Sequence, residues 1–175
     1  WQLQVAVMLL PTLAYAYLFW GQKFPEGTAA GQADIGSNLS GMMTPLYIFM
    51  ALCMVLTANT ELSTQQWVEA LLRSSGANPM WVLALTTGIM ALGRYFGGPL
   101  IHRLNPTGVL WISSFLAALG IFLLSRVTGN GVYVAAAIFA MGVCYFWPTM
   151  LGFTGEYIPR SGALGMSVMG GVGMF

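Results

Sequence analysis

Charged residues are scarce in this chain of 175 residues, where they make up 6% of the sequence. An ordinary soluble domain carries about 25% charged residues. Hydrophobic residues reach 57%, and the mean hydropathy is +0.74. The sequence therefore predicts an all-α fold, a polytopic bundle of helices embedded in a lipid bilayer.

Basic residues, cysteine and histidine are also rare. Six Lys+Arg against five Asp+Glu give a net charge of +1, which excludes a nucleic-acid surface. Cys53 and Cys144 lie inside apolar runs and are expected to be small buried hydrophobes. No second histidine completes a ligand set with His102, so we expect no metal and no cofactor. Glu61 has no acidic partner within helical reach, which argues against an enzyme.

Apolar runs long enough for helices divide the chain into three parts. A bilayer needs about 20 apolar residues per spanning helix. Residues 1–20 form a first span, 21–41 a polar loop, and 42–175 a further group of helices. The expected helices of this group cover 42–73, 79–102, 107–124, 132–153 and a last run from 162. That last run is shorter than a span, so we expect a fragment of a larger protein.

A polar patch interrupts the second apolar run. Its candidate substrate contacts are Asn59, Glu61, Gln65, Gln66 and Trp67. Polar groups at membrane depth need a partner or water, so a helix that keeps them commonly lines a cavity or a solute path. Glu61 is also the candidate for proton coupling. The alternatives are solvation of Glu61 at the membrane surface and hydrogen bonds between helices for the amides.

The expected helix 132–153 carries a proline near its middle. Pro148 removes a backbone hydrogen bond and should bend the helix, as transporters do at substrate depth. Tyr145 and Trp147 beside it are further candidate substrate contacts. Such aromatic residues also serve as packing or lipid-facing groups.

The expected helix 79–102 ends in a glycine-rich segment with basic residues. Its candidate gating residues are Gly93, Arg94, Gly97, Gly98, His102 and Arg103. Gly93 and Gly97 form a G-x-x-x-G pattern, which allows close approach between helices. Arg94 enters the membrane and must be paired or extend towards the surface.

This segment resembles the short-loop motif G-x-L-x-D-R-x-G-R of the major facilitator superfamily. Gly98, Leu100 and Arg103 match the motif, His102 stands where the family has aspartate, and Asn105-Pro106 replaces the closing Gly-Arg. The segment 24–26 resembles the start of the family's central loop. The polar second helix and the helix with Trp147-Pro148 are similar to sugar permeases of the fucose–proton symporter type.

The resemblance implies a partial major-facilitator fold, covering roughly the sixth to eleventh of twelve helices. Residues 1–20 would close the amino-terminal half, 21–41 would be the central cytoplasmic loop, and 42–175 would be a truncated carboxy-terminal half. The implied partners are the missing amino-terminal half, the lipid bilayer, a small-molecule solute and a coupling ion, H⁺ or Na⁺.

The function expected from these features is secondary active transport of a small polar solute, with a sugar favoured, in a multi-pass protein of the cell membrane. Alternating access would move two halves around a site at the midplane. Efflux of amphipathic compounds is the alternative, and a cavity dominated by aromatic residues and methionines would favour it. A structural subunit that does not transport would tolerate apolar replacement of Asn59, Glu61 and Gln66.

Overall fold

The computed structural model describes residues 2–22, 35–72, 75–98 and 104–174, and the regular elements of these residues are all helical. The chain divides into two compact units, Trp1–Gln32 and Ala33–Phe175. The first unit contains α1 (Gln2–Phe19), a helix of 18 residues with Pro11 inside it. The expected all-α class is confirmed for the described residues.

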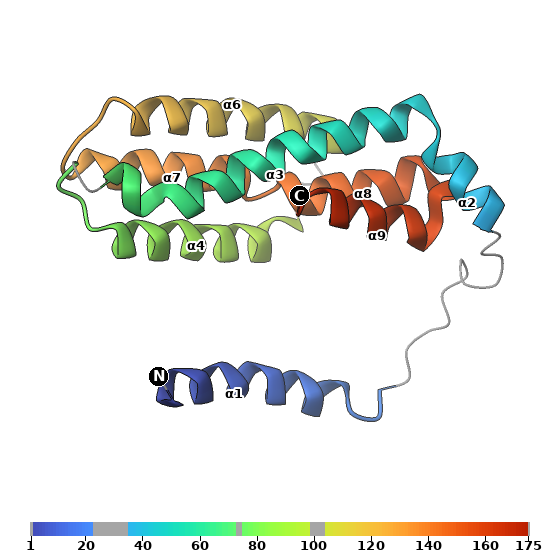
Figure 1. Cartoon of the computed structure of the whole chain (residues 1–175), viewed down its shortest axis with the longest axis horizontal. Helices are drawn as coiled ribbons and strands as arrows, with labels where there is room; N and C mark the ends of the chain where they lie inside the picture. The colour runs from blue at the N-terminus through green and yellow to red at the C-terminus, as the bar shows by residue number, and fades with distance from the viewer. Residues whose placement is uncertain (1, 23–34, 73–74, 99–103, 175) are drawn as a thin grey trace. The chain divides into compact units, whose positions relative to one another are not determined.

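The second unit holds the remaining helices (Figure 1). They are α2 (Ile35–Met42), α3 (Pro45–Leu72), α4 (Pro79–Phe96), α6 (Pro106–Leu124), α7 (Gly131–Val143), α8 (Phe146–Tyr157), the short 3₁₀ helix η2 (Pro159–Ser161) and α9 (Gly162–Val172). α7 packs against both α6 and α4, whereas α8 packs against α3, α6 and α9. The break between α7 and α8 therefore lies where these two groups of helices meet.

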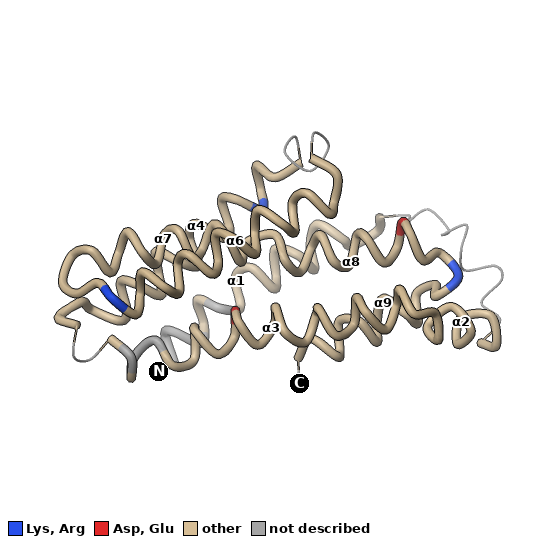
Figure 2. Tube along the Cα trace, turned by 90° about the horizontal axis from the view of Figure 1, so that it is seen from above, with Lys and Arg blue, Asp and Glu red and all other residues tan. Residues whose placement is uncertain are grey.

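Among the described residues, three helical segments are long and apolar enough to cross a membrane. They are Pro45–Trp67, Pro106–Leu124 and Gly131–Tyr157, the last of which combines α7 and α8. Charged residues colour only a few points of the trace in Figure 2. These segments have the length and composition expected of a helical membrane protein. Neither α1 nor α4 is in this set, although the sequence predicted a spanning helix in each place, and α1 contributes only the shorter apolar stretch Leu9–Phe19.

Two helices begin at the prolines of the Asn78-Pro79 and Asn105-Pro106 pairs. α4 begins at Pro79 and α6 at Pro106, in each case with proline in the first turn, where its missing N–H costs no hydrogen bond. The Asn78 side chain accepts a hydrogen bond of 2.9 Å from the Met80 N–H, but Asn105 makes no such cap. The predicted start at residue 79 is confirmed, whereas α6 begins one residue before the expected residue 107, and only one of the two asparagines stabilises its helix directly.

Helix α2 lies in a segment where the sequence predicted a loop. Its glycines and serines have low helix propensity, which favours a loop when the segment is considered alone. In the fold, Gly41 packs so tightly against the backbone of Arg160 and Ser161 that a Cβ would lie 2.7 Å from the Ser161 nitrogen. Contacts with a distant segment therefore make this stretch helical. The turn at Met43 and Thr44 separates it from α3.

Helices α6 and α7 approach each other closely at two glycines. A Cβ on Gly120 would lie 2.5 Å from the Phe139 Cα, and one on Gly142 would overlap the backbone nitrogen of Ala117. Small residues allow such backbone approach between helices in membranes. The α6–α7 pair is therefore held by direct contact of the two backbones.

The buried side chains of the described residues form three clusters, two of which lie next to the α7–α8 break. The first, here called the α7 core, consists of Met90, Ala117, Phe139, Ala140, Val143, Cys144 and Phe146. The second, here called the methionine core, consists of Tyr47, Met50, Met54, Met150, Ile158 and Met169. The first joins α4, α6, α7 and the start of α8, and the second joins α3, α8 and α9.

Candidate functional site

The candidate site is built around the break between α7 and α8. α7 ends at Val143 and α8 begins at Phe146. Pro148 has no N–H to donate to the carbonyl of Cys144, which lies four residues before it, and its ring crowds that carbonyl. The sequence predicted a bend at Pro148 in one continuous helix. The structure instead has two helices, with the interruption at Cys144 and Tyr145.

The carbonyl that Pro148 leaves without a helical partner is bound by an arginine of α4. Arg94 Nε donates a hydrogen bond of 3.0 Å to the Cys144 carbonyl oxygen. Its Nη2 lies 3.6 Å from Glu61 Oε1 on α3. One guanidinium therefore joins three parts of the fold: the carboxylate of α3, its own helix and the broken helix.

Glu61 is the more enclosed member of this ion pair. Its side chain is 7% exposed, whereas the Arg94 side chain is 43% exposed. Among the described residues, Glu61 Oε2 is buried without a hydrogen-bond partner. The distance of 3.6 Å to Arg94 also exceeds that of a charged hydrogen bond, about 2.7 to 2.9 Å. The carboxyl group therefore lies near a cation, and its Oε2 is still able to bind a proton or accept a hydrogen bond.

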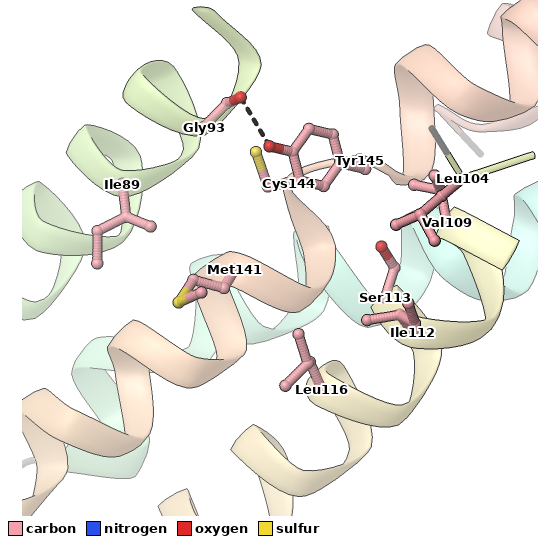
Figure 3. Close-up of a pocket in the computed structure, with 10 residues that line it drawn as sticks. All are labelled: Ile89, Gly93, Leu104, Val109, Ile112, Ser113, Leu116, Met141, Cys144 and Tyr145. Carbon is pink, nitrogen blue, oxygen red and sulfur yellow. Dashed lines mark hydrogen bonds between the residues drawn. The ribbon is translucent and has the colours of Figure 1, made fainter. Parts of the chain in front are cut away.

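Further hydrogen bonds tie the break to α4. The Tyr145 hydroxyl donates to the Gly93 carbonyl at 2.8 Å, and the Cys144 thiol donates to the Met90 carbonyl at 3.4 Å. Figure 3 shows Tyr145 and Cys144 reaching Gly93 together. A Cβ on Gly97 would lie 2.6 Å from the Tyr145 ring. The G-x-x-x-G pair thus provides the flat surface against which the break packs.

A cavity of about 300 Å³ lies beside this contact, between α4, α6 and α7. Its wall is mostly aliphatic, and Ser113, Cys144 and Tyr145 supply its polar atoms. Figure 3 shows the Ser113 hydroxyl turned into the space below Tyr145. The cavity leaves room around the break for side chains to rearrange.

The predicted residues Glu61 and Gln65 follow one face of α3 towards its neighbours, together with Thr57. Thr57 lies 3.5 Å from Met150 Sδ of α8, Glu61 pairs with Arg94, and the Gln65 amide nitrogen lies 3.7 Å from Met90 Sδ of α4. Their spacing of four residues places them on one side of a helix. Glu61 is the one that reaches a charged group.

The structure does not bring the other predicted residues of α3 to this site. Asn59 is exposed and donates to the Val55 carbonyl of its own helix at 2.9 Å. Gln66 is exposed, and Trp67 is 62% exposed. Trp147 is half-buried against the methionine core. These side chains do not contact the Glu61–Arg94 pair, because they lie on other faces of α3 and α8.

The predicted gating motif is described only in part. Gly93, Arg94 and Gly97 belong to the site, whereas Gly98 is exposed with open space around its Cα. His102 and Arg103 lie outside the described residues. Among the residues that the structure describes, no group of three metal-ligating side chains comes together.

The sequence did not identify two partners at the site. One is the Cys144 carbonyl, which the position of Pro148 points to, since a proline always leaves the carbonyl four residues earlier without its donor. The other is the pairing of Arg94 with Glu61, which joins residues 33 positions apart. Only the packing of α3 on α4 reveals this pairing.

A larger cavity of about 780 Å³ lies between α3, α6 and α8. Aliphatic side chains, a cysteine and a few hydroxyl groups form about half of its wall. The other half consists of four aromatic residues and two methionines: Phe49, Trp111, Phe115, Phe153, Met50 and Met150. No asparagine or glutamine is among the described residues that line it. This wall suits a large apolar ligand better than a sugar.

The chain was compared with protein-family models, with curated proteins and with solved structures, and none of the three comparisons found a match.

Proposed function

We propose that this chain is part of a secondary active transporter, a multi-pass protein of the cell membrane that moves a small polar solute. A sugar is the solute that we favour, and the gradient of a coupling ion, H⁺ or Na⁺, would drive its movement. The partial major-facilitator fold inferred from the sequence belongs to the same proposal. In that arrangement the solute path would run between this group of helices and a second half of the protein.

The observation that carries the proposal is the ion pair between Glu61 and Arg94 beside a broken apolar helix. A carboxylate is costly to bury inside an apolar span such as that of α3, and proteins that keep charged groups there commonly use them in ion or substrate pathways. Transporters also place interrupted helices at their binding sites, because the break frees backbone groups for binding. Glu61 combines both features through Arg94, which binds the freed carbonyl of Cys144.

The direct test measures uptake of radiolabelled sugars into vesicles that carry the full-length protein, with and without a protonophore. We expect accumulation in the wild type, loss of accumulation with the protonophore, and loss in Glu61→Gln. Replacing sodium by choline separates the two ions, since a sodium-driven transporter would fail in choline and resist the protonophore. Glu156→Gln is the matched control, because Glu156 is an exposed carboxylate near the end of α8.

Unchanged accumulation in Glu61→Gln would remove this carboxyl group from the coupling mechanism. Absence of uptake for every sugar would remove sugars as the solute and favour the second candidate. Normal uptake after apolar replacement of Asn59 and Gln66 would exclude these amides from the solute path.

Efflux of amphipathic compounds is the second candidate, and the larger cavity favours it. An aromatic and methionine-rich wall adapts to ligands of varied shape, as in promiscuous binding surfaces. The test measures accumulation of a fluorescent lipophilic cation in cells that express the full-length protein. We expect efflux to weaken in Trp111→Ala, which alters the cavity, but not in Trp81→Ala, an exposed tryptophan of α4 outside the cavity.

A further inference from the structure

We propose that Arg94 is a positioning residue that couples the charge of Glu61 to the opening of the α7–α8 break. This inference rests on the proposed function only in taking Glu61 as the group that gains and loses a proton. Its basis is that one guanidinium binds the carboxylate of α3 and the free carbonyl of Cys144 at the same time. A change in the charge of Glu61 must therefore alter how Arg94 holds the Cys144 carbonyl.

The geometry leaves the Cys144 carbonyl dependent on this one side chain, while Tyr145 and Cys144 make their own hydrogen bonds to α4. In an uninterrupted helix the Cys144 carbonyl would accept a hydrogen bond from residue 148, but that residue is proline. Arg94 replaces the missing donor at 3.0 Å. The Cys144 N–H still donates to Ala140, and the Thr149 N–H donates to Tyr145, so ordinary helix continues on both sides. The interruption is therefore confined to Cys144 and Tyr145, and Arg94 holds the carbonyl that Pro148 leaves free.

The charges around Glu61 favour a proton over a sodium ion as the species that changes its state. α3 packs against α2, α4, α8 and α9. The titratable groups described on these helices and at the break are Arg94, Tyr95, Cys144, Tyr145, Glu156 and Tyr157, and α3 itself adds Tyr47 and Cys53. Of these, Arg94 is the charged group that contacts Glu61. A fixed cation at 3.6 Å repels Na⁺, whereas a proton on the carboxylate simply cancels the ion pair.

The coupling then follows from electrostatics. With Glu61 charged, the ion pair holds the guanidinium in place, and the guanidinium holds the Cys144 carbonyl. With Glu61 neutral, Arg94 loses its counter-charge and its half-exposed side chain is free to turn towards water or an anionic group. The Cys144 carbonyl loses its donor, the break keeps only the hydrogen bonds of Tyr145 and Cys144 to α4, and α8 moves more easily relative to α7.

The test is hydrogen exchange of the backbone N–H groups in a peptide covering 140–149, measured on the purified full-length protein. We expect exchange in Glu61→Gln to be about tenfold faster than in the wild type, the effect of weakening one charged hydrogen bond on a local opening equilibrium. Arg94→Ala should show the same acceleration, and the double variant should add nothing further. Arg94→Lys should restore part of the protection against exchange. This variant also provides the test if Arg94→Ala fails to fold.

A pH series separates coupling from a purely structural role. The exchange rate of the wild type, divided by that of Glu61→Gln at the same pH, should rise towards one as the solution becomes acidic. This dependence should vanish in Arg94→Ala. Pro148→Ala supplies a new N–H for the Cys144 carbonyl, so in that background Glu61→Gln should change nothing. Glu156→Gln should behave as the wild type does.

Equal exchange in the wild type and Glu61→Gln would overturn the proposal, as would multiplicative effects of Glu61→Gln and Arg94→Ala. Transport assays on the same variants keep the two ideas distinct. Linked exchange without transport driven by either H⁺ or Na⁺ would support the coupling and refute the proposed function. Proton-dependent transport without linked exchange would refute the coupling alone.

Discussion

The Tyr145 hydroxyl donates a hydrogen bond of 2.8 Å to the carbonyl of Gly93, so the first residue before α8 is fastened to the last turns of α4. Gly93 itself packs against Cys144, where a Cβ would lie 2.7 Å from the sulfur. This contact holds the break against α4 independently of the charged groups nearby. Its strength can be measured with one atom removed.

Tyr145→Phe removes only the hydroxyl oxygen of this contact. We expect the free energy of unfolding to fall by about 1 kcal/mol, the usual net value of one hydrogen bond. Titration with SDS in mixed micelles measures the change. Tyr157→Phe is the control, since Tyr157 is exposed and its ring stacks on Phe153 without help from the hydroxyl. Equal losses of unfolding free energy in both variants would show that the hydrogen bond to Gly93 does not stabilise the fold.

Gly142→Ala tests the close approach of α6 and α7. An added methyl group would overlap the Ala117 backbone, so we expect a loss of about 1 to 3 kcal/mol from overpacking. Gly88→Ala places the same methyl group in open space on α4, where alanine should raise helix stability by about 0.5 to 1 kcal/mol. Opposite signs in thermal unfolding of the two variants are the expected outcome. A neutral Gly142→Ala would mean that the two helices can separate freely.

Asn78→Ala tests the one Asn-Pro pair that caps its helix. Loss of the hydrogen bond to the Met80 N–H should cost about 1 kcal/mol of the free energy of unfolding. Asn105→Ala is the matched control, because Asn105 precedes Pro106 in the same way but caps nothing. Chemical denaturation should distinguish them. If the two losses were equal, the capping bond would not account for the effect.

Arg94→Leu should leave the Glu61 carboxylate without its counter-charge. Breaking a fully buried pair costs about 3 to 5 kcal/mol, and since Arg94 is 43% exposed we expect a smaller loss, about 1 to 2 kcal/mol. The double variant with Glu61→Leu should be less destabilised than Arg94→Leu alone. Arg126→Leu, at an exposed arginine beside Phe122, should change stability little. If the double variant were less stable than Arg94→Leu, the unpaired Glu61 carboxylate would not be the cause of the loss.

The features that sequence predicted well are local ones. Pro79 and Pro106 mark helix starts because proline fits the first turn and disfavours a helical conformation in the residue before it. Pro148 marks an interruption for the same kind of reason, although the sequence predicted only a bend and the structure has two separate helices. In each case the chemistry of one residue decides the backbone around it.

The candidate site depended on contacts that no local pattern contains. The polar patch of α3 has side chains on several faces, and the sequence could not tell that Glu61 turns inward while Asn59 and Trp67 stay exposed. The choice depends on how α3 is rotated against α4 and α8. Helix α2 is a second case, since its packing on Arg160 and Ser161 outweighs the low helix propensity of its glycines and serines.

The methionine core has a consequence for the mechanics of the fold. Four of its six members are unbranched thioether side chains, whereas the α7 core consists mainly of alanine, valine and phenylalanine. Methionine adopts many rotamers at similar energy and refills gaps when its neighbours shift. The interior around α8 is therefore plastic, and the interior around α7 is stiff. A force applied at α8 should be absorbed by side chains that slide past one another, while α6 and α7 transmit it unchanged.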